Sequence, residues 1–108
     1  MSNTLMTLTD FADRHLNLGE NDVILDVRNP DEFQAGHIKG ALNIPLPEVG
    51  TRADELKKYH QVYIHCKRGG RAKTAFELLK SAGLENLVCI HDAGMDLWME
   101  NGHPVVVP

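Results

Sequence analysis

The sequence predicts a small, open α/β fold, in which a mainly parallel sheet of about five strands carries helices on both faces. Short, almost continuous apolar runs, such as residues 23–27 and 62–65, alternate along the chain with stretches of helical spacing. Such runs are typical of strands that are buried on both faces, as in a parallel sheet covered by helices. The chain of 108 residues is long enough for one core, so we expect a single domain over residues 1–108.

The elements are expected in a regular order. A helix should begin near Thr9, a residue type that caps helix amino termini, and end at Gly19. Further helical patterns cover residues 30–33, 51–59, 72–82 and 94–101; the expected strands cover 23–27, 41–44, 62–65 and 87–91, and a terminal extended run covers 105–107. Ligands of such sheets bind beyond the carboxyl ends of the strands, which brings Asp26, Cys66 and Asp92 to one edge.

A cysteine and a basic, glycine-bearing loop follow the strand at 62–65. After Cys66 come Lys67, Arg68, Gly69, Gly70 and Arg71, and a helical pattern follows directly. A helix amino terminus presents unpaired backbone N–H groups and the positive end of the helix dipole, and both stabilise an anion. Gly69 and Gly70 allow backbone N–H groups to point inward at no Cβ cost. This pattern predicts a thiolate nucleophile at Cys66, because an inert buried cysteine rarely precedes two glycines and three cations.

Two separated motifs resemble those of single-domain rhodaneses. The first is the Cys-x4-Arg loop at 66–71, which is one residue shorter than the His-Cys-x5-Arg loop of tyrosine and dual-specificity phosphatases. The second is Leu-Asp-Val-Arg at 25–28, then Glu-Phe at 32–33 and the run at 36–45. The resemblance covers about residues 23–105. One departure is Ala93, which stands where the family's Gly-Gly-x3-Trp motif has its first glycine.

The resemblance implies a rhodanese-like fold and a thiosulfate sulfurtransferase activity. Cys66 would take sulfane sulfur from thiosulfate or a similar anion as a persulfide and pass it to cyanide or a thiol, without cofactor or metal. The residues implied in donor binding are Lys67, Arg68, Gly69, Gly70 and Arg71. Two alternatives stay open: a persulfide carrier that works with a thioredoxin-like protein or a desulfurase, and a phosphatase or arsenate reductase, which the short loop disfavours.

Several other side chains receive structural roles. We expect Arg28 to pair with Asp31 or Glu32 and to fix the following turn, whereas Arg71 should fold across the loop toward a bound oxyanion. The resemblance implies a structural role for His37 in the turn before the next strand. Cys89 lies inside an apolar strand and is expected to be a buried apolar cysteine. A zinc site is disfavoured because alternation along the strand points His65 and Cys66 to opposite faces.

Composition and charge exclude several classes of function. A net charge of −4 argues against general nucleic-acid or membrane-surface binding. Two cysteines without a paired spacing favour a reducing compartment. Residues 1–7 have neither the basic nor the apolar region of a secretory signal, and no apolar run reaches the length of a membrane span. We therefore expect a cytoplasmic protein.

Overall fold

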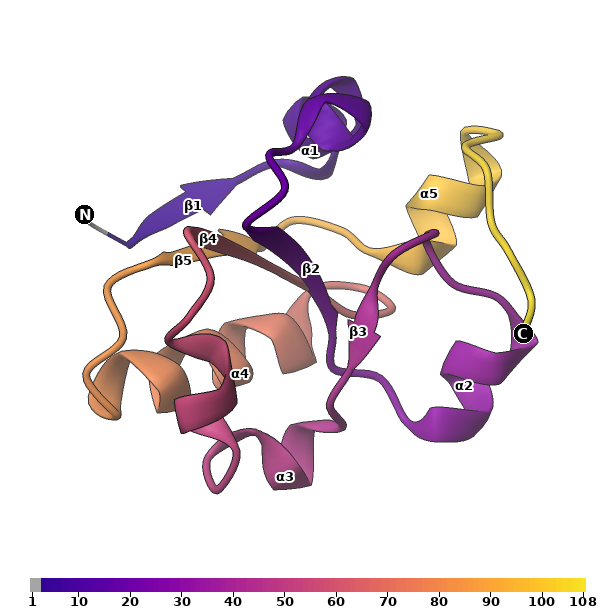
Figure 1. Ribbon diagram of the computed structural model, residues 1–108. Coiled ribbons are helices and arrows are strands. Elements are labelled where there is room, and N and C mark those ends of the chain that lie inside the picture. Colours follow the sequence, from indigo (N-terminus) through magenta and orange to yellow (C-terminus); the bar gives the residue numbers. More distant parts are fainter. Residues whose placement is uncertain (1–2) are drawn as a thin grey trace.

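The computed structural model describes residues 3–108 and contains a five-stranded sheet in which every neighbouring pair of strands is parallel (Figure 1). The strands are β1 (Thr4–Met6), β2 (Asp22–Asp26), β3 (Leu42–Asn43), β4 (Gln61–His65) and β5 (Leu87–Ile90). Their order in the sheet is β1-β5-β4-β2-β3, so β4 lies at the centre. The predicted fold class is confirmed.

Helices cover both faces of this sheet. They are α1 (Leu8–Arg14), η1 (His15–Asn17, a 3-10 turn), α2 (Pro30–Ala35), α3 (Leu46–Val49), η2 (Ala53–Leu56, a 3-10 turn), α4 (Gly70–Ser81) and α5 (Met95–Glu100). In Figure 1, α3 and α4 lie below the sheet and α1 lies above it. Successive side chains of β4 point into two separate hydrophobic cores, one on each face of the sheet. Ile64 packs in the core on the α4 side, and Tyr63 packs with Phe11 of α1 in the core on the other side.

The fifth strand is not the one that the sequence indicated. The terminal run at 105–107 contributes only an isolated antiparallel bridge between Val106 and His37, with backbone N···O distances of 2.8 and 2.9 Å. The sheet is completed instead by β1, which pairs with β5. The side chain of Asn3 supports this pairing, since it donates to the carbonyl of Leu84 and accepts from the N–H of Leu87, each at 3.0 Å.

Two expected helices also differ in detail, and a further helix, α3, lies where none was expected. Helix α1 begins earlier than expected, because Thr7 rather than Thr9 accepts the N–H of Asp10 at 3.1 Å and caps the helix. The helical pattern at 51–59 forms only the short 3-10 turn η2. Pro47 lies inside α3, at a first-turn position where its missing N–H costs no hydrogen bond. Within residues 3–108 no helix is both long and apolar enough to cross a membrane.

Candidate active site

Cys66 directly follows the central strand β4 and lies under the amino terminus of α4. Its sulfur accepts two backbone hydrogen bonds, from the N–H of Gly69 at 3.0 Å and from the N–H of Ala72 at 3.3 Å. Gly69 has a φ of +113°, in the left-handed region that favours glycine, and this turn directs its N–H toward the sulfur. Two donors and the positive end of a helix dipole thus surround one sulfur atom, which is an environment suited to a thiolate.

The loop residues enclose a small hollow above the sulfur. The cavity measures about 350 Å³ and is lined by Cys66, Lys67, Arg68, Gly70 and Arg71. Cys66 is only 1% exposed, so a reactant reaches the sulfur through this hollow and not across an open surface. Five of the six residues proposed from the sequence therefore line one cavity, and the sixth, Gly69, supplies an N–H to the sulfur.

The amino terminus of α5 and the glycine before it hold the loop from outside. The N–H of Met95 donates to the carbonyl of Cys66 at 2.8 Å, and the N–H of Asp96 donates to that of Lys67 at 3.2 Å. Gly94 packs so closely that a Cβ there would lie 2.7 Å from the carbonyl carbon of Cys66. Position 93 does not require a glycine, because its backbone does not adopt a positive φ; none of the described non-glycine residues does. The second glycine of the family motif is thus the one that the packing requires.

Gly94→Ala is expected to destabilise the protein by about 1–3 kcal/mol, because the added methyl group must displace the loop backbone. Gly50→Ala is the matched control, since Gly50 has ordinary helical angles and open space around its Cα. Urea unfolding followed by circular dichroism measures both. Equal unfolding midpoints for the two variants would contradict the close approach at Gly94.

Carboxylates partner two of the three loop cations. Arg71 makes a two-pronged contact with Glu32 of α2, with N···O distances of 2.7 and 3.1 Å. This contact lowers the pKa of Glu32 to about 2. Arg68 is largely exposed and donates to Asp96 at 3.1 Å. Arg71 lines the hollow while its guanidinium contacts Glu32, and its expected contact with a bound oxyanion stays a prediction.

A buried ion pair supports the loop from below. The guanidinium of Arg28 donates to both carboxylate oxygens of Asp26, the shortest N···O distance being 2.7 Å, and also to the carbonyl of Gly36 at 2.8 Å. The expected pairing of Arg28 with Asp31 or Glu32 is wrong, since its guanidinium pairs with Asp26 at the end of β2 instead. The carbonyl of His65 accepts from the N–H of Val27 at 3.1 Å, which joins this end of β2 to β4.

His65 is not placed to act on the Cys66 sulfur. Its ring is 1% exposed and its Nε2 lies 3.8 Å from Asp26 Oδ2, on the sheet face opposite the Cys66 side chain. Burial lowers the pKa of His65, so the ring is neutral at neutral pH. Among residues 3–108, no three His, Cys, Asp or Glu side chains are grouped in a way that could hold a metal ion.

Cys89 is expected to stay unreactive in the folded protein. It is fully buried in β5, where burial raises the pKa of its thiol to about 11, so the nucleophilic thiolate is scarce at neutral pH. Iodoacetamide at pH 7.5 should label Cys66 in the native protein and both cysteines in urea, as read by peptide mass. Native labelling of Cys89 as fast as in urea would contradict this assignment.

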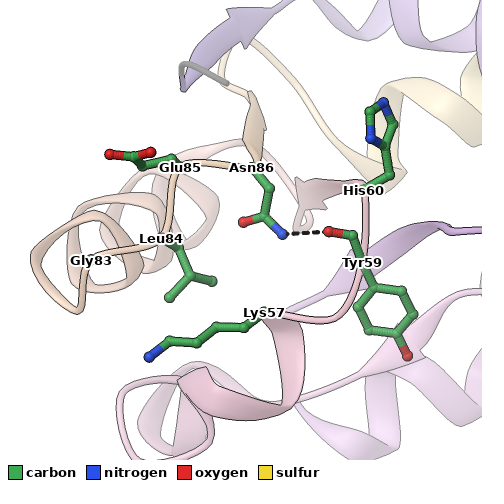
Figure 2. A pocket seen from close by; sticks show the side chains of 7 residues that line it. All are labelled: Lys57, Tyr59, His60, Gly83, Leu84, Glu85 and Asn86. Carbon is green, nitrogen blue, oxygen red and sulfur yellow. Dashed lines mark hydrogen bonds between the residues drawn. The ribbon is translucent and has the colours of Figure 1, made fainter.

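A second hollow lies at the other end of β4 and β5 (Figure 2). His60 and Asn86 in its wall directly precede these strands, and the Asn86 side-chain amide donates to the carbonyl of Tyr59 at 2.8 Å. Its other lining residues are Lys57, Gly83, Leu84 and Glu85. Because Cys66 follows the opposite end of β4, this hollow is separate from the cysteine site.

Sequence reasoning missed the residues that fix the loop. Glu32 contacts Arg71 across 39 positions of sequence, and Asp96 contacts Arg68 across 28. The sequence carries a Glu-Phe motif at 32–33, but no local spacing rule connects it to the loop. The capping box of α2 was the available signal, since Glu32 also accepts the N–H of Asn29 at 3.0 Å and is thereby held in place.

The fold and the site define an open parallel α/β protein with a cysteine in a basic, glycine-bearing loop at the carboxyl edge of its sheet. Residues 9–101 match the rhodanese-like domain, and the chain belongs to that family. It is 30% identical to a sulfurtransferase of Allochromatium vinosum over 82% of each chain. A rhodanese-related protein of Thermoplasma volcanium has the same fold, with a TM-score of 0.81 and 29% identity over 97% of this chain and 99% of its own.

The chain also matches part of a longer protein. It is 40% identical to the putative sulfur carrier protein YrkF of Bacillus subtilis over 60% of this chain, and the match spans 35% of that relative. Rhodanese-like domains therefore occur both as short chains and as parts of longer proteins.

Proposed function

We propose that this protein is a sulfurtransferase that carries a sulfane sulfur on Cys66 as a persulfide. The observation that supports this most is the Cys66 sulfur held by the N–H groups of Gly69 and Ala72 under the amino terminus of α4. These donors stabilise a thiolate before transfer and an anionic persulfide after it. The proposed mechanism assigns no separate general base, because the two N–H donors favour the thiolate form of the nucleophile.

The proposed reaction has two steps. The Cys66 thiolate attacks the outer sulfur of thiosulfate or a similar anion, a new S–S bond forms, and sulfite leaves with the electron pair of the broken bond. Cyanide or a thiol then attacks the outer persulfide sulfur and regenerates the thiolate. Lys67, Arg68 and Arg71 line the cavity, and Lys67, which has no carboxylate partner among residues 3–108, favours an anionic donor most directly. Gly69 and Gly70 shape the loop.

A persulfide carrier is the second candidate, and the likeness to a sulfur carrier protein favours it. A carrier would accept sulfur stoichiometrically from a partner such as a desulfurase, pass it to a thioredoxin-like protein, and turn over thiosulfate slowly. The two free cysteines, Cys66 and Cys89, fit either role in a reducing compartment, and we propose that the protein is cytoplasmic.

Steady-state production of thiocyanate from thiosulfate and cyanide tests the proposal. We expect saturable turnover of thiosulfate and no hydrolysis of an aryl phosphate, because the six-residue loop is short and Glu32 occupies the Arg71 fork. Stoichiometric loading with slow turnover would favour the carrier. Saturable, Cys66-dependent hydrolysis of the aryl phosphate would overturn the assignment.

A further inference from the structure

The positive charge of the loop is mostly compensated within the protein. Glu32 and Asp96 offset Arg71 and Arg68, whereas Lys67 has no carboxylate partner within 4 Å among residues 3–108. Lys67 is therefore the one loop cation of the hollow that no carboxylate of residues 3–108 compensates. A ligand entering the hollow meets a site that is close to neutral overall, and a second negative charge on that ligand finds no free partner.

Hydrogen bonds hold the side chain of Glu32 in place and keep its carboxylate ionised. Its carboxylate oxygens accept both prongs of the Arg71 guanidinium, and one of them also accepts the N–H of Asn29. Its side chain is only 26% exposed, and the hydrogen bonds from Arg71 hold its pKa near 2. The carboxylate of Glu32 is thus negatively charged at neutral pH.

We propose that Glu32 determines the charge selectivity of the Cys66 loop, favouring singly charged or neutral sulfane-sulfur donors such as organic persulfides over dianions such as thiosulfate. This inference rests on the proposed sulfur transfer and names its donor class. Glu32 does not touch the donor itself; it acts by neutralising the positive charge of Arg71, and in this sense it is a positioning residue. The fork of Arg71 is free to bind a second donor charge only when Glu32 is neutral or absent.

The transfer balances for such a donor. The Cys66 thiolate attacks the outer sulfur of R–S–SH, and an S–S bond forms at Cys66. The S–S bond of the donor breaks, R–S⁻ leaves with its electron pair, and the proton stays on the transferred sulfur. The single charge moves from Cys66 to the leaving thiolate, so no dianion has to be accommodated at any stage.

Two matched probes isolate the effect of donor charge. Methanethiosulfonate, CH₃SO₂–S⁻, differs from thiosulfate by a methyl group in place of one charged oxygen. Coulomb energy is proportional to ligand charge, so one added positive charge acts twice as strongly on the dianion. For Glu32→Gln we expect kcat/KM to rise about tenfold for thiosulfate and about threefold for methanethiosulfonate, and both gains should shrink as salt rises.

The ratio of the two kcat/KM values is the decisive quantity, because a general loss of loop order lowers both values equally. Glu32→Gln should shift this ratio about threefold toward thiosulfate, and Arg71→Gln about threefold toward methanethiosulfonate. The Glu32→Gln/Arg71→Gln double variant restores charge balance and should return the ratio to that of the wild type. Glu55→Gln, which removes an equal charge from an exposed pair with Arg52, should not change it.

The outcomes separate this inference from the proposed function. If the wild-type protein takes sulfur from neither probe, the sulfurtransferase assignment fails. If it takes sulfur from both and Glu32→Gln leaves the ratio unchanged, the charge-selectivity role of Glu32 is wrong. Should Glu32→Gln fail to fold, Arg71→Gln and the double variant still decide the matter, since an unchanged ratio in Arg71→Gln overturns the inference.

Discussion

Replacing Cys66 by alanine is expected to abolish sulfur transfer, lowering kcat/KM by more than about 1,000-fold, because no other group in the hollow can hold the transferred sulfur. The variant should remain folded. Losing the sulfur leaves the N–H groups of Gly69 and Ala72 without their acceptor, at a cost of about 1–3 kcal/mol that water entering the hollow reduces. Thiocyanate production and circular dichroism measure the two effects.

Cys89→Ala is the control for this experiment. Cys89 is the other cysteine of the chain, and it is buried in the same core as Cys66. Its removal should leave turnover unchanged and lower only the stability, through the loss of a buried side chain. Wild-type turnover in Cys66→Ala, or loss of turnover in Cys89→Ala alone, would contradict the assignment of the nucleophile.

Arg28→Ala is expected to have the largest effect on stability, lowering the free energy of unfolding by about 3–5 kcal/mol. The reason is the carboxylate of Asp26, which is fully buried and receives three hydrogen bonds from the Arg28 side chain. Without Arg28 this charge has no cation in contact, and the Gly36 carbonyl also loses a donor. Chemical denaturation followed by tryptophan fluorescence reports the change, since Trp98 is fully buried.

Arg52→Ala is the matched control, because Arg52 also bridges carboxylates, those of Glu48 and Glu55, but at the exposed surface. Water screens such pairs, so this variant should unfold at almost the wild-type midpoint. If Arg28→Ala lost no more stability than Arg52→Ala, the buried pair would not be a major support of the fold.

Features encoded by neighbouring residues were predictable from the sequence. The apolar run of β4, the cysteine after it, the two glycines and the helical pattern of α4 are contiguous, and together they define the Cys66 loop. The parallel sheet also followed from local patterns, since each buried strand carries its own apolar run. The prediction of helix α1 was confirmed, but the predicted cap was two residues too late. Thr7 and Thr9 are equally good capping types, so the sequence does not distinguish them.

Features that depend on distant pairing were not predictable. Strand β1 has three residues, its Leu5 is 62% exposed, and only its partner β5, more than 80 residues away, makes it a strand. The valine run at 105–107 has the stronger β propensity, but β1 already pairs with β5, and Val106 reaches only His37. The contact between Glu32 and Arg71 joins positions 39 residues apart, so the capping box of α2 indicates that Glu32 is held in place but not which cation it meets.

The intact mass of the protein after incubation with thiosulfate tests the central claim most directly. We expect the mass of one sulfur atom to be added to the wild-type protein, removed again by cyanide, and absent from Cys66→Ala. Peptide mapping should place the added atom on Cys66 and leave Cys89 unmodified. An unchanged mass after incubation with both thiosulfate and methanethiosulfonate, or an added sulfur that persists in Cys66→Ala, would contradict the persulfide account.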